Sequence, residues 1–247
     1  MSRPLLIVGF VVAISSAIPA QSPEPPLADT RLTVHTLVRE DIFAGFLQND
    51  LTRLARAEKN LETLYAARPD ERAGILAWQG STALTRAAQA NEAKQPDQFQ
   101  QHYRRAQDLF AEAMKVGPEN VGVFAITGGS QVGIADRLPP TERTASWELG
   151  YKAYQQLWKL QGPIIEKLPL HHKGEVLSGL AQTAQRTGRS DEAATNLDRI
   201  LTLMPDTPYA SRARQWKDDP SVRTSRLACQ TCHGPGTLVS RLAEVSK

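Results

Sequence analysis

The sequence predicts an all-α protein built from repeated helical hairpins, and three observations lead to that prediction. Residues 32–217 are rich in Ala, Leu, Gln, Glu and Arg, which are good helix formers. Apolar residues recur in this region at steps of three and four, and the alternation that is typical of strands is rare. Several of the predicted helices also end in a similar way, which indicates internal repetition.

The similar helix ends read "NLETLYAARPDE", "LFAEAMKVGPEN" and "LDRILTLMPDTP". Each contains a proline, which cannot continue a helix and therefore marks a stop. An alanine lies twelve residues before each proline, a large apolar residue eight before it and another apolar residue five before it. The stops are Pro69, Pro118 and Pro205, and the preceding residues are Ala57, Leu61 and Leu64, then Ala106, Phe110 and Ala113, then Ala193, Leu197 and Ile200.

Residues 1–20 are predicted to form a secretory signal peptide. Arg3 supplies a positive start, and the uncharged, mostly apolar run from Leu5 to Ile18 is followed by small residues up to Ala20. Such a run is too short to cross about 30 Å of hydrocarbon, so we expect cleavage after Ala20, with a retained N-terminal anchor as the alternative. The predicted location is the periplasm or the exterior, without a stable membrane span after cleavage, and the compartment is oxidising.

The next segment and the charge pattern narrow the possible functions. Residues 21–31 begin as "QSPEPPLAD" and predict a Pro-rich extended leader without a core of its own. The formal net charge is +3, and the basic residues are scattered rather than interleaved with aromatic residues. Nucleic acid is therefore not an expected partner.

The clearest repeat unit covers residues 174–207. Leu177, Leu180, Ala181 and Ala184 line one predicted helix, Gly188 ends it, and Ser190 is the expected N-cap of the next. These residues resemble the tetratricopeptide repeat, a pair of antiparallel helices of about 34 residues. The resemblance implies an α-solenoid over residues 32–217 that binds a protein or peptide partner in its groove.

The other three units match this pattern less closely. Residues 38–71 place Gly45 where the first helix usually has a small residue, and "QANEAKQPDQF" lengthens residues 73–118. The stretch "DRLPPTER" interrupts residues 119–169, where the spacing of the family fails. A helical bundle without repeats is the alternative architecture.

The C-terminal segment, residues 218–247, holds the only two cysteines of the chain. Pro220 suits the first position of a helix that Asp219 can cap, and a Gly-Pro-Gly sequence from residue 234 ends it. Cys229 and Cys232 are three positions apart, and His233 follows directly. Three interpretations of the two cysteines do not involve haem. A structural zinc site needs four ligands, and a catalytic dithiol normally lies at a helix N-terminus after a strand. A disulfide between the two cysteines is possible in an oxidising compartment.

The fourth interpretation is covalent haem. One helical turn separates the two sulfurs, which lets them bond the two vinyl groups of one porphyrin, and the next residue brings its imidazole under the iron. The sequence Cys-x-x-Cys-His resembles the haem-attachment motif of c-type cytochromes. This resemblance implies one haem c that is bound covalently by Cys229 and Cys232, with His233 as the proximal iron ligand.

The resemblance to c-type cytochromes covers the motif alone and leaves the sixth iron ligand open. Only 14 residues follow His233, and none of them is methionine. The candidates upstream are Met204, in the last turn of a repeat, and His171 and His172, in the predicted loop "LPLHHKGE"; His35 and His102 are further possibilities. An open sixth position, as in the helical cytochromes c prime, is the alternative.

Three functions are consistent with these observations. The first is electron transfer by the haem to a redox partner that the repeats position, with Arg223, Arg226 and Arg241 as candidates to pair with haem propionates or an acidic partner. The second is a periplasmic scaffold or assembly protein with a Cys229–Cys232 disulfide and no haem. The third is an open-site haem sensor or a peroxidase. The sequence singles out no catalytic acid or base, so it does not decide whether the protein is an enzyme.

Overall fold

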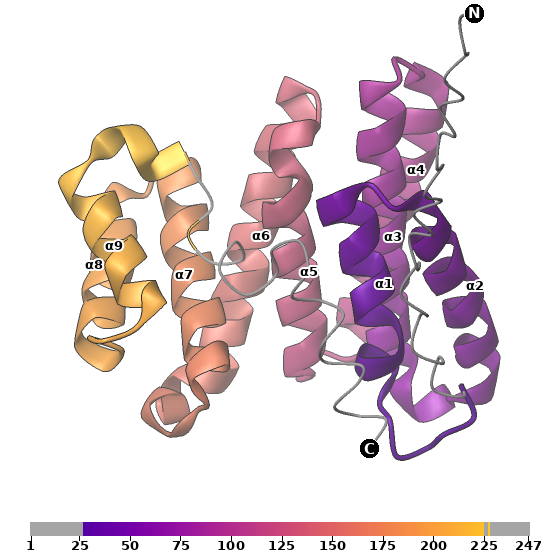
Figure 1. Ribbon diagram of the computed structural model, residues 1–247, viewed down its shortest axis with the longest axis horizontal. Coiled ribbons are helices and arrows are strands. Elements are labelled where there is room, and N and C mark those ends of the chain that lie inside the picture. Colours follow the sequence, from indigo (N-terminus) through magenta and orange to yellow (C-terminus); the bar gives the residue numbers. More distant parts are fainter. Residues whose placement is uncertain (1–26, 225–226, 228–247) are drawn as a thin grey trace, which may run out of the picture.

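The computed structural model describes residues 27–224 and residue 227. This part of the chain forms nine α-helices, short 3₁₀ turns and no strand, so the all-α prediction is confirmed (Figure 1). None of the helices in these ranges is both long enough and apolar enough to span a membrane. The helices are α1 (Val34–Gln48), α2 (Leu51–Ala67), α3 (Arg72–Glu92), α4 (Pro96–Val116), α5 (Val121–Ile134), α6 (Pro140–Gln161), α7 (Leu170–Arg186), α8 (Ser190–Leu203) and α9 (Pro208–Asp218).

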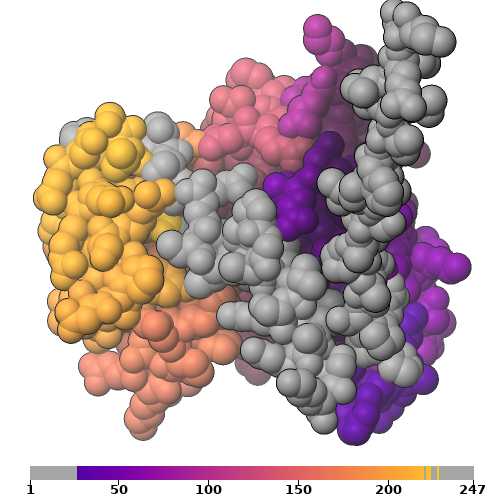
Figure 2. Space-filling view, viewed as in Figure 1, coloured from indigo at the N-terminus to yellow at the C-terminus, as the bar shows by residue number. Residues whose placement is uncertain are grey.

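The helices pack as sequential hairpins. Helices α1 and α2, α3 and α4, α5 and α6, and α7 and α8 form pairs, and α9 packs against α8. The first helices of neighbouring pairs also contact one another, α1 with α3, α3 with α5, and α5 with α7. The pairs therefore follow one another along the long axis of the molecule, from indigo α1 to orange α9 (Figure 1). The same order is visible in the space-filling view, with the α7–α9 end on the left (Figure 2).

The three predicted proline stops lie where the sequence placed them. Helices α2, α4 and α8 end two residues before Pro69, Pro118 and Pro205. The nine apolar residues that precede these prolines at the repeated spacing are all buried, and each exposes 5% of its surface or less. The recurring pattern therefore marks the face of each second helix that packs into its hairpin.

Glycines allow the two helices of three hairpins to approach closely. A Cβ atom on Gly45 of α1 would lie 2.8 Å from Leu54, and one on Gly80 of α3 would lie 2.8 Å from Phe110. A Cβ atom on Gly128 of α5 would lie 2.8 Å from the ring of Tyr154. In each pair a glycine of the first helix thus receives a large side chain of the second helix, as the position of Gly45 predicts.

Two stretches that depart from the repeat spacing also form hairpins. The unit 73–118 is long because α3 and α4 both have 21 residues. In the unit 119–169 a 3₁₀ turn, Ala135–Arg137, ends α5, and α6 begins at Pro140, whose missing N–H costs nothing in the first turn. The interruption "DRLPPTER" is therefore the connection between two paired helices.

Two local predictions differ from the structure. His171 and His172 lie in the first turn of α7 rather than in a loop, because the helix begins at Leu170, directly after Pro169. Gly188 ends the preceding helix with a positive φ of 79°, as predicted, but Ser190 is the first residue of α8 and not its N-cap. The N-cap position belongs to Arg189, whose guanidinium pairs with Glu148 of α6.

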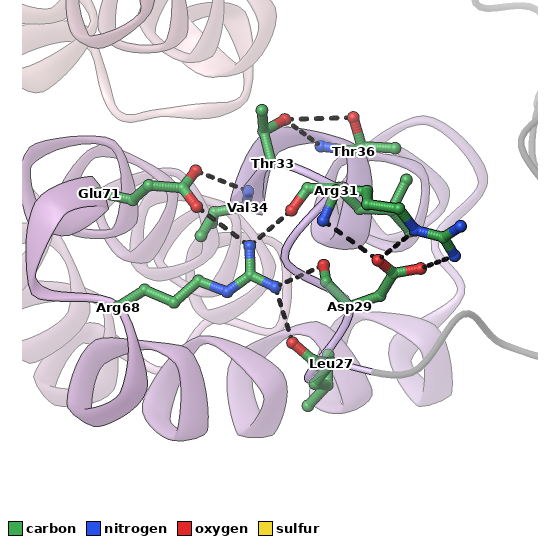
Figure 3. A network of polar contacts seen from close by, with 9 residues as sticks. Leu27, Asp29, Arg31, Thr33, Val34, Thr36, Arg68 and Glu71 are labelled. Carbon is green, nitrogen blue, oxygen red and sulfur yellow. Dashed lines mark hydrogen bonds and ion pairs between the residues drawn. The ribbon is translucent and has the colours of Figure 1, made fainter.

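The end of the predicted leader is attached to the first hairpin by Arg68 (Figure 3). The guanidinium of Arg68 donates hydrogen bonds to the carbonyl oxygens of Leu27, Asp29 and Leu32 at 2.5–2.9 Å. It also pairs with Glu71, whose other carboxylate oxygen accepts from the amide of Val34 at 2.8 Å. Arg68 thereby joins the end of α2 to the start of α1.

The chain after α9 turns back onto α7. Residues Pro220–Thr224 form a 3₁₀ turn, where the sequence predicts a helix, and Asp219 accepts from the amide of Ser221 at 2.8 Å in the predicted capping role. Leu227 exposes only 4% of its surface, and its amide donates to Oε1 of Gln182 on α7 at 3.0 Å. The predicted signal peptide (1–20) and the motif residues Cys229, Cys232 and His233 lie outside the described residues.

Candidate functional site

The candidate site is a pocket of about 460 Å³ that we call the central pocket, lined by residues of α1, α3, α5, α6, α7 and α9. Most of the surface that it presents is apolar. Pockets for cofactors and other small molecules have volumes of about 300–1,000 Å³ and are mostly apolar, with a few polar groups that fix orientation. The central pocket has both properties, and its polar groups gather at two ends.

The first polar end lies on α1 and α3. Arg39 donates to Oε1 of Glu40 at 3.1 Å and contacts Nε2 of His35 at 3.1 Å. A guanidinium has no acceptor, so His35 accepts this hydrogen bond. The rings of His35 and Phe43 lie 5.5 Å and 5.9 Å from that of Trp78, which is 3% exposed. This end of the pocket therefore combines an aromatic wall with a permanent cation.

Trp78 also carries an unused hydrogen-bond donor. Its indole Nε1 is buried and has no hydrogen-bond partner among the described residues. Because almost all buried polar atoms in proteins have a partner, such a donor points to a group that binds beside it. Trp78 and Arg39 both line the central pocket, so a carboxylate bound there would have a guanidinium and an indole N–H among its candidate donors.

Helix α5 contributes two glycines, an alanine and an isoleucine to the wall of the pocket. Gly122, Ala125, Ile126 and Gly129 line it from positions three, four and seven residues apart, which lie on one face of a helix. A Cβ atom on Gly129 would meet nothing closer than the hydroxyl oxygen of Tyr154 at 3.8 Å. Gly129 thus leaves open space in the pocket, although a glycine inside a helix lowers the helix propensity by about 1 kcal/mol.

The second polar end lies on α7. His171, His172 and Glu175 all line the pocket, and the rings of the two histidines are 5.8 Å apart and nearly perpendicular. Nε2 of His171 is 4.0 Å from Oε2 of Glu175, one helical turn further along α7. Burial raises the pKa of Glu175 to about 7 from its ordinary value of 4.5.

The raised pKa of Glu175 predicts that the protein loses stability as the pH rises from weakly acidic to neutral. The folded protein holds this proton more tightly than the unfolded chain, so the free energy of unfolding falls as the pH rises from 4.5 through 7. The shift corresponds to about 3 kcal/mol at most. Because 28% of the side chain is exposed, we expect about 1–2 kcal/mol between pH 5 and pH 8.

Urea unfolding of the Cys229→Ala/Cys232→Ala protein, with and without Glu175→Gln, measures this effect. Glutamine keeps the shape of the neutral carboxyl and cannot ionise, so the variant should lose less stability over this pH range. Equal losses in the two proteins would contradict the prediction.

The sixth-ligand candidates divide between the pocket and the rest of the fold. His171, His172 and His35 line the central pocket. Met204 caps α8 and is 2% exposed within the apolar core, and His102 lies on α4 outside the pocket, where burial lowers its pKa. The structure therefore brings three histidines from two distant parts of the sequence to one cavity. Arg223, a candidate for haem propionates, donates instead to the carbonyl oxygens of Trp216 and Lys217.

Several pocket residues were not singled out by their sequence pattern. Arg39, Trp78 and Glu175 lie in ordinary amphipathic helices, and nothing in their spacing marks them as neighbours. The stretch "VGVFAITGGSQVGI" is the one part of the sequence that could have indicated the pocket. Four glycines in a helix of 14 residues indicate close packing or open space. Within residues 27–224 and 227, no group of three or more His, Cys, Asp or Glu side chains is arranged to hold a metal ion.

The central pocket fits a haem in its chemistry. The apolar walls suit the porphyrin, Arg39 and the unpartnered donor of Trp78 suit its carboxylates, and each of the three histidines carries a possible axial nitrogen. In comparisons with known proteins, no family model, no curated protein and no solved structure matches the chain.

Proposed function

We propose that this protein is an exported c-type cytochrome-like electron carrier, in which tetratricopeptide-like repeats hold one haem in the central pocket. The haem is bound through thioether bonds to Cys229 and Cys232, with His233 as the proximal ligand. The proposal rests on the Cys-x-x-Cys-His sequence, and the described residues support it in two ways.

The first support is the architecture. Sequential hairpins in which a glycine of the first helix receives a large side chain of the second are typical of tetratricopeptide-like units. Such a stack builds one continuous surface from its first helices, and the central pocket is lined by the first helices α1, α3, α5 and α7 together with residues of α6 and α9. A cofactor in this pocket would be held by all four hairpins and by α9 at once.

The second support carries the proposal furthest and concerns the position of Leu227. Its amide is bound to Gln182, which lies seven residues, or two turns, after Glu175 on the same face of α7. Seven residues of helix span about 10 Å. Cys229 lies two positions after Leu227 and His233 six positions after it, so the motif reaches about 7–20 Å from this anchor. The tether of the haem would therefore begin about 10 Å of helix from Glu175, a residue of the pocket, and it is long enough to cover that distance.

The residues of the chain have separate roles in this proposal. The haem supplies an iron that takes up and releases one electron at a time. Phe43, Trp78 and Tyr154 exclude water from the porphyrin, and Arg39 with the indole N–H of Trp78 orients its carboxylates. A dry, fixed site lowers the reorganisation that accompanies electron transfer, and the partner protein docks near the exposed edge.

Covalent haem content tests the proposal. The protein is exported in a host that matures c-type haem, and the pyridine haemochrome spectrum of wild type is compared with that of Cys229→Ala/Cys232→Ala. We expect one haem per wild-type chain that stays bound after denaturation, and none in the variant.

A wild-type protein without covalent haem, in cells where a control cytochrome matures, would overturn the proposal. Mass spectrometry would then show whether Cys229 and Cys232 form a disulfide, which is the property of the scaffold alternative. Haem that is bound but released on denaturation would also contradict a c-type attachment.

A further inference from the structure

The central pocket offers three histidines, and their surroundings differ enough to choose between them. Met204 is buried in the apolar core and His102 lies on α4, and neither residue lines the central pocket. His35, His171 and His172 remain. The question is which imidazole stands in an environment that favours binding to iron.

The environment of His35 disfavours iron binding. Its Nε2 accepts a hydrogen bond from the guanidinium of Arg39 at 3.1 Å, so the lone pair on that nitrogen is engaged by a permanent cation. Its ring also lies 5.5 Å from that of Trp78, which closes one side of it. His35 therefore belongs with Arg39 to the polar end of the pocket that suits carboxylates.

The environment of His171 favours iron binding. Metal-bound histidines almost always direct their second ring nitrogen to a carboxylate, a carbonyl or water, which fixes the ring and raises its basicity. Nε2 of His171 lies 4.0 Å from Oε2 of Glu175, which is an ion-pair distance rather than a hydrogen bond, and a histidine paired through one ring nitrogen can bind a metal through the other. Among the described residues, His172 has only the ring of His171 as an aromatic neighbour and makes no hydrogen bond or ion pair.

The position of His171 along α7 also favours it as the iron ligand. His171, Glu175 and Gln182 lie at steps of four and seven residues, so they share one face of the helix. Gln182 holds Leu227, from which the haem motif continues. The candidate ligand and the anchor of the haem tether thus lie on one stripe of α7, with about 16 Å of helix between them.

We propose that His171 is the sixth ligand of the haem iron and that Glu175 positions its ring. This inference rests on the proposed function, because it needs the haem on Cys229 and Cys232. It predicts a six-coordinate, low-spin iron with two histidine ligands, His233 and His171. Such an iron has a lower reduction potential than one with a methionine ligand, and carbon monoxide must displace His171 to bind.

The experiment compares haem-loaded wild type with His171→Ala, His171→Met and His172→Ala. Haem content is measured first by pyridine haemochrome, so that a failure of the proposed function appears as missing haem in wild type. The ferric absorption and electron paramagnetic resonance spectra then report the spin state. Half of the side chain of His171 is exposed, so its replacement leaves the fold intact.

We expect wild type and His172→Ala to be low-spin and His171→Ala to become high-spin, with carbon monoxide binding at least tenfold faster. His171→Met should restore the low-spin state and raise the reduction potential. A His171→Ala protein that carries a full haem and stays low-spin would overturn the assignment. A high-spin wild-type protein would do the same and would favour the open-site sensor.

Discussion

Replacing Gly179 by alanine is expected to lower the free energy of unfolding by about 2–3 kcal/mol. A Cβ atom at this position of α7 would lie 2.3 Å from the ring of Tyr154, which is 3% exposed. The ring cannot move away, because Gly128 of α5 receives it from another side, where an added Cβ would lie 2.8 Å from it. Tyr154 is thus held between the first helices of two neighbouring hairpins.

The expected loss for Gly179→Ala includes a partial compensation. Alanine is the better helix former, and this preference offsets up to about 1 kcal/mol of the stability that is lost through overpacking. The control is Gly129→Ala, where the nearest atom to the new Cβ is 3.8 Å away. Urea unfolding should show the control to be as stable as wild type or slightly more stable. If Gly179→Ala were also neutral, α5 and α7 would not approach each other through Tyr154.

The Arg68→Ala variant is expected to lose about 2–3 kcal/mol of stability. Three carbonyl oxygens of the segment before α1 and the carboxylate of Glu71 would lose a charged donor together (Figure 3). The side chain of Arg68 is only 11% exposed, so water replaces these bonds poorly. Leu27 and Leu32, which pack against the first hairpin, would also lose their attachment.

Arg31→Ala is the matched control for Arg68→Ala. Arg31 pairs with Asp29 at 2.6 Å, but its side chain is 86% exposed, and exposed pairs contribute little to stability. Limited proteolysis near residue 30 provides a second measurement, because loss of the Arg68 contacts should expose this segment to cleavage. Equal stability of the Arg68→Ala and Arg31→Ala proteins would contradict the role of Arg68 as the attachment of the segment.

The repeat pattern predicts the helices well, for a physical reason. Each proline stop and the alanine twelve residues before it concern contacts within one hairpin, and hairpins are local in sequence. The buried positions of Leu61, Phe110 and Leu197 follow from helix periodicity alone. Residues 27–31 are a contrast, because their attachment depends on Arg68, which the sequence places more than thirty positions away.

The central pocket is predicted from the sequence only in part. His171 and His172 are named as candidate ligands because they are histidines, whereas their neighbours depend on how four hairpins stack. Arg39 and Trp78 reach the pocket from α1 and α3, and Glu175 acquires its raised pKa from burial that no local pattern encodes. Helix periodicity identifies the core face of each helix, but it does not show which exposed faces meet across the stack.

The measurement that tests the central claim most directly is the ferric spectrum of haem-loaded Gly129→Leu. The claim is that the haem carried by Cys229 and Cys232 lies in the central pocket. Gly129 lines that pocket and the Cβ of a leucine there would meet no atom closer than the hydroxyl oxygen of Tyr154 at 3.8 Å, so we expect the larger side chain to occupy space in the pocket. The control is Gly74→Leu on α3, where a Cβ meets no atom within 4 Å and which is not among the pocket-lining residues.

Both leucine variants should carry one covalent haem per chain, because thioether bonds do not depend on the pocket. We predict that Gly129→Leu displaces the haem, which raises the high-spin fraction and speeds carbon monoxide binding, while Gly74→Leu matches wild type. A Gly129→Leu protein with full haem content and the spectrum of wild type would place the haem elsewhere and contradict the account.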